Sequence, residues 1–278
     1  MGDTLRPDRL VLGVLSDRAE RTLREVYATT IEAGTPVVVT DFATAELVKV
    51  FANAFLATKI SFINAIAEVC EVTGADVVDL ADSLGYDDRI GRKFLNAGVG
   101  FGGGCLPKDM RAFVHRAGEL GAEGAMSLLS QVDDINQGRR EHAVQVATSM
   151  LGGHVAGARV AVWGAAFKPQ TDDVRDSPAL WIAGQLHLRG ADVSVYDPKA
   201  NDTARGMFPT LTYATDAASC AHDADLLLHL TAWPEFAEVD PAKLISEVRS
   251  PLLLDGGNCL DFAAWRAAGW TVRGLGRR

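Results

Sequence analysis

Cysteine, basic charge and long apolar runs are all scarce in this sequence, and each shortage excludes a class of protein. The 278 residues include only four cysteines, which lie far apart and form no C-x-x-C pair. We therefore expect neither a disulfide scaffold nor a metal site. The 36 acidic residues outnumber the 27 basic ones, and the net charge is -9. Because the basic residues are also scattered, nucleic acid is not an expected partner.

The chain also lacks the sequence features of a targeted or membrane-inserted protein. Its first ten residues contain no apolar signal core, and no uninterrupted apolar run approaches the ~20 residues that a membrane helix needs. We therefore expect a cytoplasmic protein with reduced thiols and no membrane partner. Hydrophobic side chains make up 48% of the sequence, which is enough for a sizeable core in one large domain or two ordinary ones.

Residues 1–40 are the first of three segments with different patterns. Two short apolar runs, at 9–14 and 35–40, flank an amphipathic stretch at 16–29 that Ser16 opens. This pattern predicts a single βαβ unit, which is too small for a domain and is typical of the end of a parallel-sheet domain. We interpret the segment as the remnant of a Rossmann domain that binds NAD.

Residues 41–152 are predicted to be helical. From Asp41 to Thr73 the sequence contains neither glycine nor proline, so it can form one helix of ~30 residues and ~45 Å. Shorter helices are expected at 75–84, after Pro107 and at about 125–151. The segment is therefore expected to be an all-helical domain built around one long helix.

Residues 153–278 alternate short apolar runs with helical stretches. The apolar runs are rich in valine and leucine, as in ARVAVWG and DADLLLHL. Such runs are typical of strands buried on both faces of a parallel sheet. The predicted fold class is therefore α/β, with a remnant βαβ unit, a central helical domain and a C-terminal Rossmann-like domain.

The stretch GVGFGGGCLPKD has two possible interpretations. Gly98, Gly100 and Gly103 match the G-x-G-x-x-G spacing of a dinucleotide-binding loop. Such a loop needs a strand directly before it, whereas the preceding DDRIGRKFLNA is charged and helix-like, so we interpret the match as accidental. The proline at position 107 instead predicts a helix that begins beside Cys105.

A cysteine just before a helix N-terminus is a candidate nucleophile. The exposed backbone amides and the ammonium group of Lys108 both favour the thiolate of Cys105, which is the form that attacks a carbonyl carbon. The glycines before it would let a substrate approach closely. The alternative is that Cys105 is a small buried residue, as we expect Cys70, Cys220 and Cys259 to be.

The long helix carries possible partners for that cysteine. Glu46, Lys49, Asn53 and Asn64 fall on one polar stripe, whereas the other faces of the helix are apolar. A solvated face would explain such a stripe on an isolated helix. Because the helix is apolar nearly all round, we expect it to be buried, so that Lys49 and Asn53 need partners, and a substrate can be one.

Three ordered motifs resemble those of one family. The helix AELVKVFANAFLATKISFIN, the loop GFGGGCLPKD and the segment GAAFKPQTDDVRDSPA are similar to motifs of the UDP-glucose 6-dehydrogenases, and the resemblance covers residues 3–278. It implies that NAD takes hydride from C6 of UDP-glucose and that Cys105 attacks the resulting aldehyde to give a thiohemiacetal. A second NAD would then take hydride to form a thioester, from which water releases UDP-glucuronate.

The resemblance also implies roles for individual residues. Cys105 would be the nucleophile, Lys49 and Asn53 would stabilise the oxyanion, and Asp109 would help to activate water; a lysine and an amide are suitable donors for that charge. Contacts with the UDP-sugar are implied for Phe101, Gly102, Phe167 and Lys168, and across a dimer interface for Arg89. Contacts with NAD are implied for Arg175 and Lys108. Turn and capping chemistry explains the nearby Asp172 and Asp173 equally well. The long helix is expected to form a homodimer.

Two departures from the family pattern bear on activity. Family members carry a complete nucleotide-binding domain, with a glycine fingerprint and a catalytic glutamate, before the position of Asp3. We therefore expect this chain to be the C-terminal part of such an enzyme and not to reduce NAD by itself. In addition, Gly257 stands where the family usually has an arginine that helps to hold the substrate, so altered substrate affinity is expected.

The sequence leaves two other functions open. One is a non-catalytic chain that forms a dimer through the long helix and binds a nucleotide sugar without oxidising it. The other is oxidation of GDP-mannose, because GDP-mannose dehydrogenases have a similar cysteine loop.

Overall fold

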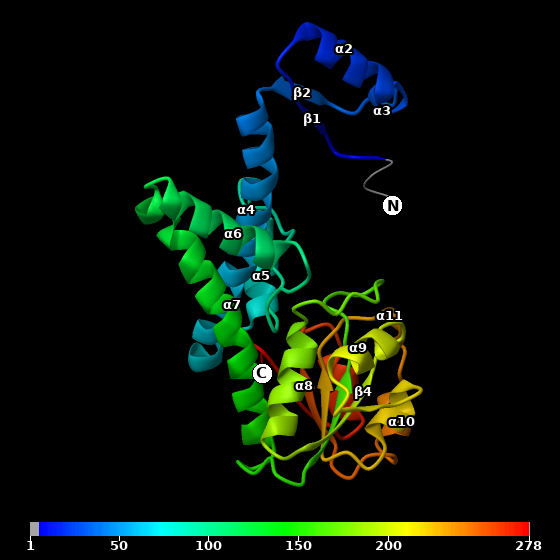
Figure 1. Ribbon diagram of the computed structural model, residues 1–278. Coiled ribbons are helices and arrows are strands. Elements are labelled where there is room, and N and C mark those ends of the chain that lie inside the picture. The colour runs from blue at the N-terminus through cyan, green and yellow to red at the C-terminus, as the bar shows by residue number, and fades with distance from the viewer. Residues whose placement is uncertain (1–5, 278) are drawn as a thin grey trace. The chain divides into compact units, whose positions relative to one another are not determined.

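The computed structural model describes residues 6–277, apart from the side chains of residues 123 and 125 (Figure 1). Residues 1–5 and 278, which the first and last predicted domains include, lie outside the described residues. The chain divides into two compact units, of which the first ends at Phe55 and the second begins at Leu56. The predicted division into domains 1–40, 41–152 and 153–278 stays a prediction.

The first unit contains the predicted βαβ arrangement. Its elements are the parallel strands β1 (Leu10–Gly13) and β2 (Val37–Thr40) and, between them, the helices α2 (Asp17–Val26) and α3 (Ala28–Glu32). Ser16 caps α2 as predicted, because its hydroxyl accepts a backbone hydrogen bond at 3.3 Å. Within the described residues before Asp41, only Leu12 is buried, so this segment forms almost no core of its own.

The long helix α4 (Phe42–Thr73) confirms the prediction of one helix without a break. Asp41 opens it by accepting a hydrogen bond from the N–H of Thr44 at 2.8 Å. By length and composition alone α4 is apolar enough to cross a membrane, with a mean hydropathy of 1.5 over its most apolar window, of which 39% is buried in the protein. A core helix of a water-soluble protein meets the same criterion, so this is weak evidence for a membrane span.

Only one side of α4 is buried, so the prediction that this helix is buried nearly all round is wrong. The buried side carries mainly small and polar residues, namely Asn53, Ala54, Ala57, Ser61, Ile63, Asn64, Ala67 and Cys70. The exposed large apolar residues are Phe42, Leu47, Phe51, Phe55, Phe62, Val69 and Val72. Apolar content shows that a helix face can be covered, but it does not show which face the neighbouring elements cover.

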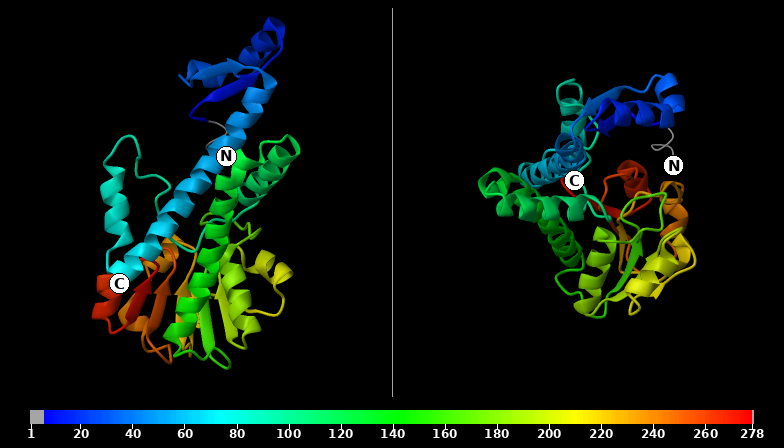
Figure 2. Two further views of the ribbon diagram at one scale, coloured as in Figure 1. Left: turned by 90° about the vertical axis from the view of Figure 1, so that its left-hand side faces the viewer. Right: turned by 45° about the horizontal axis from the view of Figure 1, so that its top comes forward.

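The helical part of the second unit follows the predicted order. Its further helices are α5 (Val77–Gly85), α6 (Leu106–Glu119) and α7 (Glu123–Met150). Helices α6 and α7 pack against each other, and α7 continues onto the sheet, where it contacts α8 (Pro178–Leu188) (Figures 1 and 2). One helix thus reaches both the cysteine loop and the sheet.

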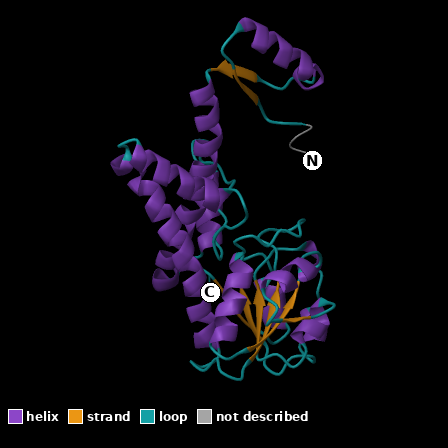
Figure 3. Cartoon of the chain, viewed as in Figure 1, coloured by secondary structure: helices purple, strands orange, loops and turns teal. Residues whose placement is uncertain are grey.

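The rest of the second unit is a parallel sheet with helices on both sides (Figure 3). Within the described residues its six strands run in the order β5-β4-β3-β6-β7-β8. They are β3 (Arg159–Trp163), β4 (Asp192–Tyr196), β5 (Thr212–Tyr213), β6 (Leu226–His229), β7 (Leu252–Asp255) and β8 (Thr271–Gly274). The shorter helices are α9 (Asn201–Met207), α10 (Ala217–Ala221), α11 (Pro234–Ala237), α12 (Pro241–Leu244) and α13 (Phe262–Ala267).

The strand order confirms the predicted Rossmann-like α/β fold. Every neighbouring pair is parallel, and the chain order reverses between β3 and β6. Sheets of this type bind ligands at the carboxyl ends of the strands near such a reversal. A binding site is therefore expected at the loop that follows β3.

Candidate active site

Cys105 lies at the N-terminus of α6, as the sequence predicts. It is the N-cap residue and is exposed, and its carbonyl oxygen accepts the N–H of Asp109 at 2.9 Å. Pro107 is buried in the first turn, where a missing N–H leaves no hydrogen bond unmade. Lys108 is exposed and lies 3.6 Å from the Asp109 carboxylate. The thiol is thus accessible, with a lysine and a carboxylate in the first turn after it.

The glycines before Cys105 are required because another segment of chain lies against them. A Cβ on Gly102 would overlap the carbonyl oxygen of Asp176. Gly103 has a φ of 88°, which favours glycine, and its N–H donates to the oxygen of Arg175 at 2.9 Å. No strand directly precedes this loop in the described chain. The loop therefore packs against residues 173–178, which agrees with treating the G-x-G-x-x-G match as accidental.

Side chains of two helices hold the same loop. The N–H of Phe101 donates to Asn136 Oδ1 at 2.7 Å, and Asn136 Nδ2 donates to the Phe101 oxygen at 3.0 Å. That oxygen also accepts from Arg140 Nη2 at 2.9 Å. Near the start of the loop, the N–H of Gly98 donates to Asn64 Oδ1 at 2.8 Å. Asn64, Asn136 and Arg140 are all buried, so these bonds are shielded from water.

Asn136 and Arg140 were not predicted from the sequence, and Asn64 was predicted only as part of a polar stripe. A signal was present, because the buried positions of α7 recur at helical spacing as Leu129, Val132, Asn136, Arg140 and Ala143. A polar residue in such an apolar series needs an internal partner. The pattern indicates that a partner exists, but it does not identify that partner.

A hollow of about 380 Å³ opens beside the cysteine loop. Its lining residues are Ile60, Phe94, Asn96, Gly100, Phe101, Gly102, Leu106, Phe167 and Lys168. They include the four residues predicted to contact the UDP-sugar within one chain. Leu106, which lines the hollow, directly follows Cys105 in the chain. Aromatic and apolar walls with one ammonium group suit an anionic ligand that has a flat apolar part.

Phe167 and Lys168 lie in the loop between β3 and α8. Asp197, at the end of β4, holds the start of this loop by accepting the N–H groups of Ala165 and Ala166 at 2.8 and 2.9 Å. At the other end of the loop, Ser177 caps the N-terminus of α8. The ammonium nitrogen of Lys168 lies 5.4 Å from the centre of the Phe167 ring. Both predicted ligand contacts are thus carried by a loop that is anchored at its two ends.

Arg175 is fixed beside the cysteine loop by Asp173. Its Nη2 and Nε donate to that carboxylate at 2.6 and 2.9 Å, and these bonds lower the pKa of Asp173 and raise that of Arg175. A Cβ on Gly104 would lie 2.5 Å from the guanidinium carbon, so the cation lies against the residue before Cys105. Asp173 also accepts a hydrogen bond from the backbone N–H of Arg175 at 3.0 Å, which is a turn contact of the kind that the sequence suggested for Asp172 and Asp173. Asp172 is exposed.

The remaining predicted site residues are not part of this hollow's lining. Lys49 and Asn53 lie in the first unit, where Lys49 Nζ donates to Asn53 Oδ1 at 3.1 Å. Asn53 is buried, but Lys49 is exposed, so the prediction of a buried lysine is wrong because α4 is covered on one side only. Arg89 is exposed and bonds to Asp87 at 2.6 Å. The approach of Lys49 and Asn53 to Cys105 and the role of Arg89 stay predictions.

The other three cysteines differ from the expectation at one position. Cys70 and Cys220 are buried as predicted, and burial raises the pKa of both, for Cys220 to about 12. Cys259 is exposed, so its assignment as a buried residue is wrong, because it follows a turn and not a strand. Its sulfur lies 3.0 Å from the oxygen of Gly257. Desolvation of the sulfur and the charge of Asp255 raise its pKa to about 11.

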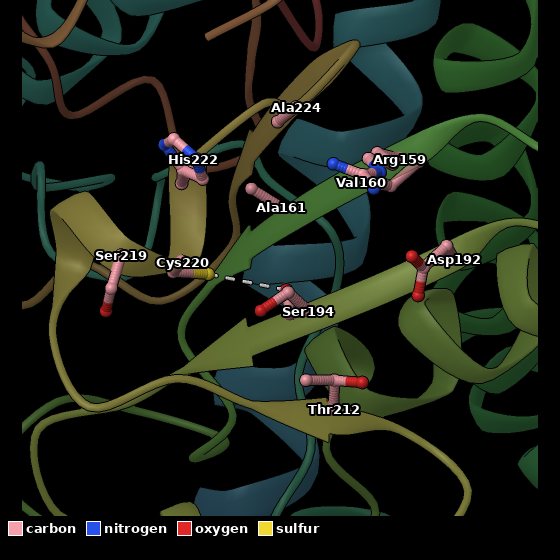
Figure 4. A pocket seen from close by; sticks show the side chains of 10 residues that line it. All are labelled: Arg159, Val160, Ala161, Asp192, Ser194, Thr212, Ser219, Cys220, His222 and Ala224. Atoms are coloured by element: carbon pink, nitrogen blue, oxygen red, sulfur yellow. Dashed lines mark hydrogen bonds between the residues drawn. The ribbon is translucent and has the colours of Figure 1, made fainter. Parts of the chain in front are cut away.

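A second hollow, of about 170 Å³, lies beside β3, β4 and β5 (Figure 4). Arg159 and Asp192, which begin β3 and β4, line it together with Ser194, Cys220 and His222. The Cys220 sulfur lies 3.4 Å from the oxygen of Ser194 and is protonated at neutral pH, because its pKa is about 12. The hollow is thus open at the amino ends of the strands, away from the edge where such sheets bind ligands.

Gly257 lies in a turn that a buried ion pair supports. Asp255 accepts from His229 Nδ1 at 2.8 Å and from the N–H groups of Gly257 and Leu260 at 3.1 and 2.7 Å. Desolvation alone would raise the pKa of Asp255, but the hydrogen bond and charge of His229, together with the N–H groups of Leu260 and Gly257, outweigh it and lower that pKa. The expected effect of Gly257 on substrate affinity stays a prediction.

The strand order and the loop at the carboxyl ends of the strands are typical of a nucleotide-binding α/β domain. Family comparison is more specific. Residues 43–138 match the central domain of the UDP-glucose/GDP-mannose dehydrogenase family, and residues 161–262 match the UDP binding domain of the same family. The chain belongs to this family, which confirms the resemblance seen in its motifs.

Individual relatives agree with this assignment. The chain is 41% identical over 276 residues to the UDP-glucose 6-dehydrogenase TuaD of Bacillus subtilis, a match that covers 99% of the chain and 59% of that protein. It is 43% identical over 256 residues to the UDP-glucose 6-dehydrogenase AglM of Haloferax volcanii, covering 91% and 58%. The structure of a UDP-glucose dehydrogenase from Pyrobaculum islandicum superposes with a TM-score of 0.89 at 35% identity, covering 99% and 60%. The chain thus spans 58–60% of the length of these relatives.

Proposed function

We propose that this chain supplies the nucleotide-sugar site and the catalytic thiol of a UDP-glucose 6-dehydrogenase, which oxidises UDP-glucose to UDP-glucuronate. The observation that carries the proposal is the hollow beside the cysteine loop, where Phe101, Gly102, Phe167 and Lys168 come together. UDP-glucose is favoured over GDP-mannose because the relatives that match 91–99% of the chain are named UDP-glucose 6-dehydrogenases.

Cys105 is the proposed nucleophile. Oxidation of the C6 alcohol, with its hydride passing to NAD, gives an aldehyde. The Cys105 sulfur adds to that aldehyde to give a thiohemiacetal, and loss of a second hydride, to a second NAD, leaves a thioester. Water then cleaves the C6–S bond, which releases the carboxylate and returns the thiol. Asp109, whose N–H donates to the Cys105 oxygen, is proposed to assist the attacking water. Lys49 and Asn53 are proposed to stabilise the oxyanion.

The residues beside Cys105 fit an anionic dinucleotide. The side chains of Arg175 and Lys108 are 68% and 75% exposed, and the guanidinium group of Arg175 lies against Gly104. Two accessible cations near the thiol suit a pyrophosphate group. We propose that they hold NAD, which when bound accepts hydride from C6 of the sugar. The cysteines are free, which suits the reducing cytoplasm that we propose as the compartment.

The exposed apolar side of α4 supports the further proposal of a homodimer. Phe55, Phe62 and Val72 are 66%, 51% and 82% exposed. Soluble monomers seldom leave such a series of large apolar side chains in water. A second copy of α4 would cover it, and Arg89 would then face the sugar bound by the partner chain.

Calorimetry with UDP-glucose and with GDP-mannose tests the proposed substrate. We expect UDP-glucose to bind and Lys168→Ala to weaken binding by about tenfold, because it removes a charge-assisted contact. Binding of GDP-mannose alone would overturn the choice of nucleotide.

The catalytic role is tested in a chain joined to the part of TuaD that it does not match. The joined protein should form UDP-glucuronate, and Cys105→Ser should abolish acid formation. Unchanged turnover in that variant would remove Cys105 from its role. A joined protein that binds UDP-glucose and forms no acid would support the non-catalytic alternative.

A further inference from the structure

The backbone N–H and carbonyl groups of Phe101 make three hydrogen bonds with side chains of α7. Its N–H and its carbonyl group both pair with the carboxamide of Asn136, at 2.7 and 3.0 Å, as they would with a residue on a neighbouring strand. Arg140 Nη2 adds the third bond, at 2.9 Å. Asn136 and Arg140 are 0% and 2% exposed. Water does not compete for these bonds, so they hold the loop four residues before Cys105 in one place.

The guanidinium group of Arg140 reaches a second loop as well. Its Nη1 donates to Asp176 Oδ1 at 2.7 Å, and its Nη2 lies 3.4 Å from the Asp176 carbonyl oxygen. Asp176 has a φ of 47°, in the left-handed region that most side chains avoid, so its conformation needs such support. Arg140 therefore connects Phe101 of the cysteine loop with Asp176 of the loop before α8.

The loop that contains Asp176 also lines the hollow. The same segment, residues 166–177, presents Phe167 and Lys168 to the proposed ligand. Within it, the N–H of Phe167 donates to the oxygen of Asp173 at 3.1 Å. Gly103 of the cysteine loop lies against the Phe167 ring, which is 2.7 Å from where a Cβ would stand. The segment thus lines the ligand position with Phe167 and Lys168, and it contacts the cysteine loop both at Phe167 and, through Arg140, at Asp176.

We propose that Asn136 and Arg140 are positioning residues that couple occupation of the hollow to the placement of Cys105. The inference rests on the proposed function, because it takes the occupant to be a nucleotide sugar. A ligand that contacts Phe167 and Lys168 orders residues 166–177, and Arg140 transmits that order to the cysteine loop. Arg140 donates to the two loops from two separate nitrogens held in one plane, whereas lysine offers a single nitrogen, so lysine is not an equivalent replacement.

Thiol labelling of the full chain measures this coupling. In a Cys259→Ser background the other cysteines, Cys70 and Cys220, are buried, so iodoacetamide reports on Cys105. The rate of alkylation is measured without and with saturating UDP-glucose, and the ratio is the protection factor. We expect a protection factor of about ten or more in the parent protein. In Arg140→Lys and Asn136→Asp we expect it to fall to about two or less, with UDP-glucose affinity about tenfold weaker.

The matched control is Arg111→Lys. Arg111 donates to both oxygens of Asp133 in α7, at 2.8 and 3.0 Å, and it makes no hydrogen bond to residues 98–104 or 166–177 within the described chain. The charge of Asp176 contributes to the raised pKa of Arg111, and a lysine keeps the positive charge at this position. Its variant should keep the protection factor of the parent. Circular dichroism establishes that each variant is folded, so that a changed protection factor reports positioning and not unfolding.

Three results would overturn one proposal or both, and they differ. Folded Arg140→Lys and Asn136→Asp variants with the protection factor of the parent would refute the coupling alone. A parent that binds UDP-glucose without any protection of Cys105 would also refute only the coupling. A parent that does not bind UDP-glucose would refute the proposed function, and the coupling with it.

If neither variant folds, hydrogen exchange of the parent protein tests the coupling between the hollow and Cys105. UDP-glucose should slow exchange of the Phe101 N–H by about tenfold or more, because ordering residues 166–177 restrains Arg140 and so the cysteine loop. Exchange that is the same with and without the ligand would refute the coupling.

Discussion

The four cysteines differ in chemistry because they differ in burial. Cys70 and Cys220 are enclosed, and burial raises the pKa of each thiol. Cys259 is exposed, yet desolvation of its sulfur and the adjacent Asp255 raise its pKa to about 11. Cys105 is exposed at the start of α6. Exposure alone therefore does not make Cys259 a reactive thiol.

We expect a single fast phase when the native chain reacts with a disulfide reagent at pH 8. A thiol with a pKa of about 11 is only ~0.1% ionised at that pH, so Cys259 should react slowly. Cys105→Ser should remove the fast phase, and Cys259→Ser should leave it unchanged. Peptide mass spectrometry assigns the labelled site. Loss of the fast phase in Cys259→Ser would contradict this prediction.

The buried Asp255 gives stability that depends on pH. Its pKa in the folded chain is lowered, because the hydrogen bond and charge of His229 and the backbone N–H groups of Leu260 and Gly257 together outweigh desolvation. The stabilisation is therefore fully present above the ordinary aspartate pKa of about 4 and is lost as pH falls through the folded pKa. Asp255→Asn should lower the free energy of unfolding at pH 7 by about 3 kcal/mol and flatten its dependence on pH between about 5 and 2.

Urea unfolding followed by tryptophan fluorescence measures this effect. All five tryptophans lie after residue 153, so the signal reports on the sheet. Asp202→Asn is the control, because Asp202 is 97% exposed and pairs only with Arg205 of its own helix among the described ion pairs. An Asp255→Asn variant as sensitive to acid as the parent would show that His229 does not hold this carboxylate.

At the scale of elements, two glycines predict opposite effects of the same substitution. Gly102→Ala should destabilise the chain by about 2 kcal/mol, because the new Cβ would overlap backbone of Asp176 that no rotamer change can move. Gly138→Ala should stabilise it by about 0.5–1 kcal/mol, because Gly138 is exposed inside α7 with open space at its Cβ. Thermal unfolding followed by circular dichroism compares the two. Equal effects would mean that residues 173–178 do not pack on the cysteine loop.

The element boundaries that the sequence predicted well are those with local chemical causes. Helix α4 ends at Thr73 because Gly74 follows with a φ of 80°, and Ser16 caps α2. The two-residue strand β5 was missed, because Thr212 and Tyr213 form no apolar run that could signal a strand. Thr212 and Tyr213 form a strand because they pair with β4 at the edge of the sheet, and not because of their own side chains.

The candidate site was predictable where a single motif carries it. Phe167, Lys168 and Arg175 lie within one loop, so their neighbourhood follows from the chain itself. The contact between Arg140 and Phe101 joins residues 39 positions apart, and it depends on how α7 packs beside the cysteine loop. Helical spacing shows that Arg140 faces inward, but no local pattern states what it will meet there. The exposure of Lys49 was mispredicted for the same reason.

For the whole molecule, the exposed side of α4 predicts the oligomeric state. Light scattering after size exclusion should give twice the mass of one chain. Phe62→Asp should give single chains, because a carboxylate buried between two helices would be desolvated without a partner. Leu188→Asp is the control, since Leu188 is 78% exposed on α8. A parent that is already a single chain would contradict the proposed homodimer.

The guanidinium group of Arg140, which bonds to two loops, has a consequence for exchanging segments between members of the family. Residues 166–177 carry the contacts proposed for the nucleotide, and their left-handed Asp176 accepts a hydrogen bond from Arg140 of helix α7. If the loop alone were exchanged, the acceptor at position 176 and the buried donor at position 140 would come from two different proteins. Designers who wish to alter nucleotide preference should therefore move the loop and the middle of α7 together as one cassette.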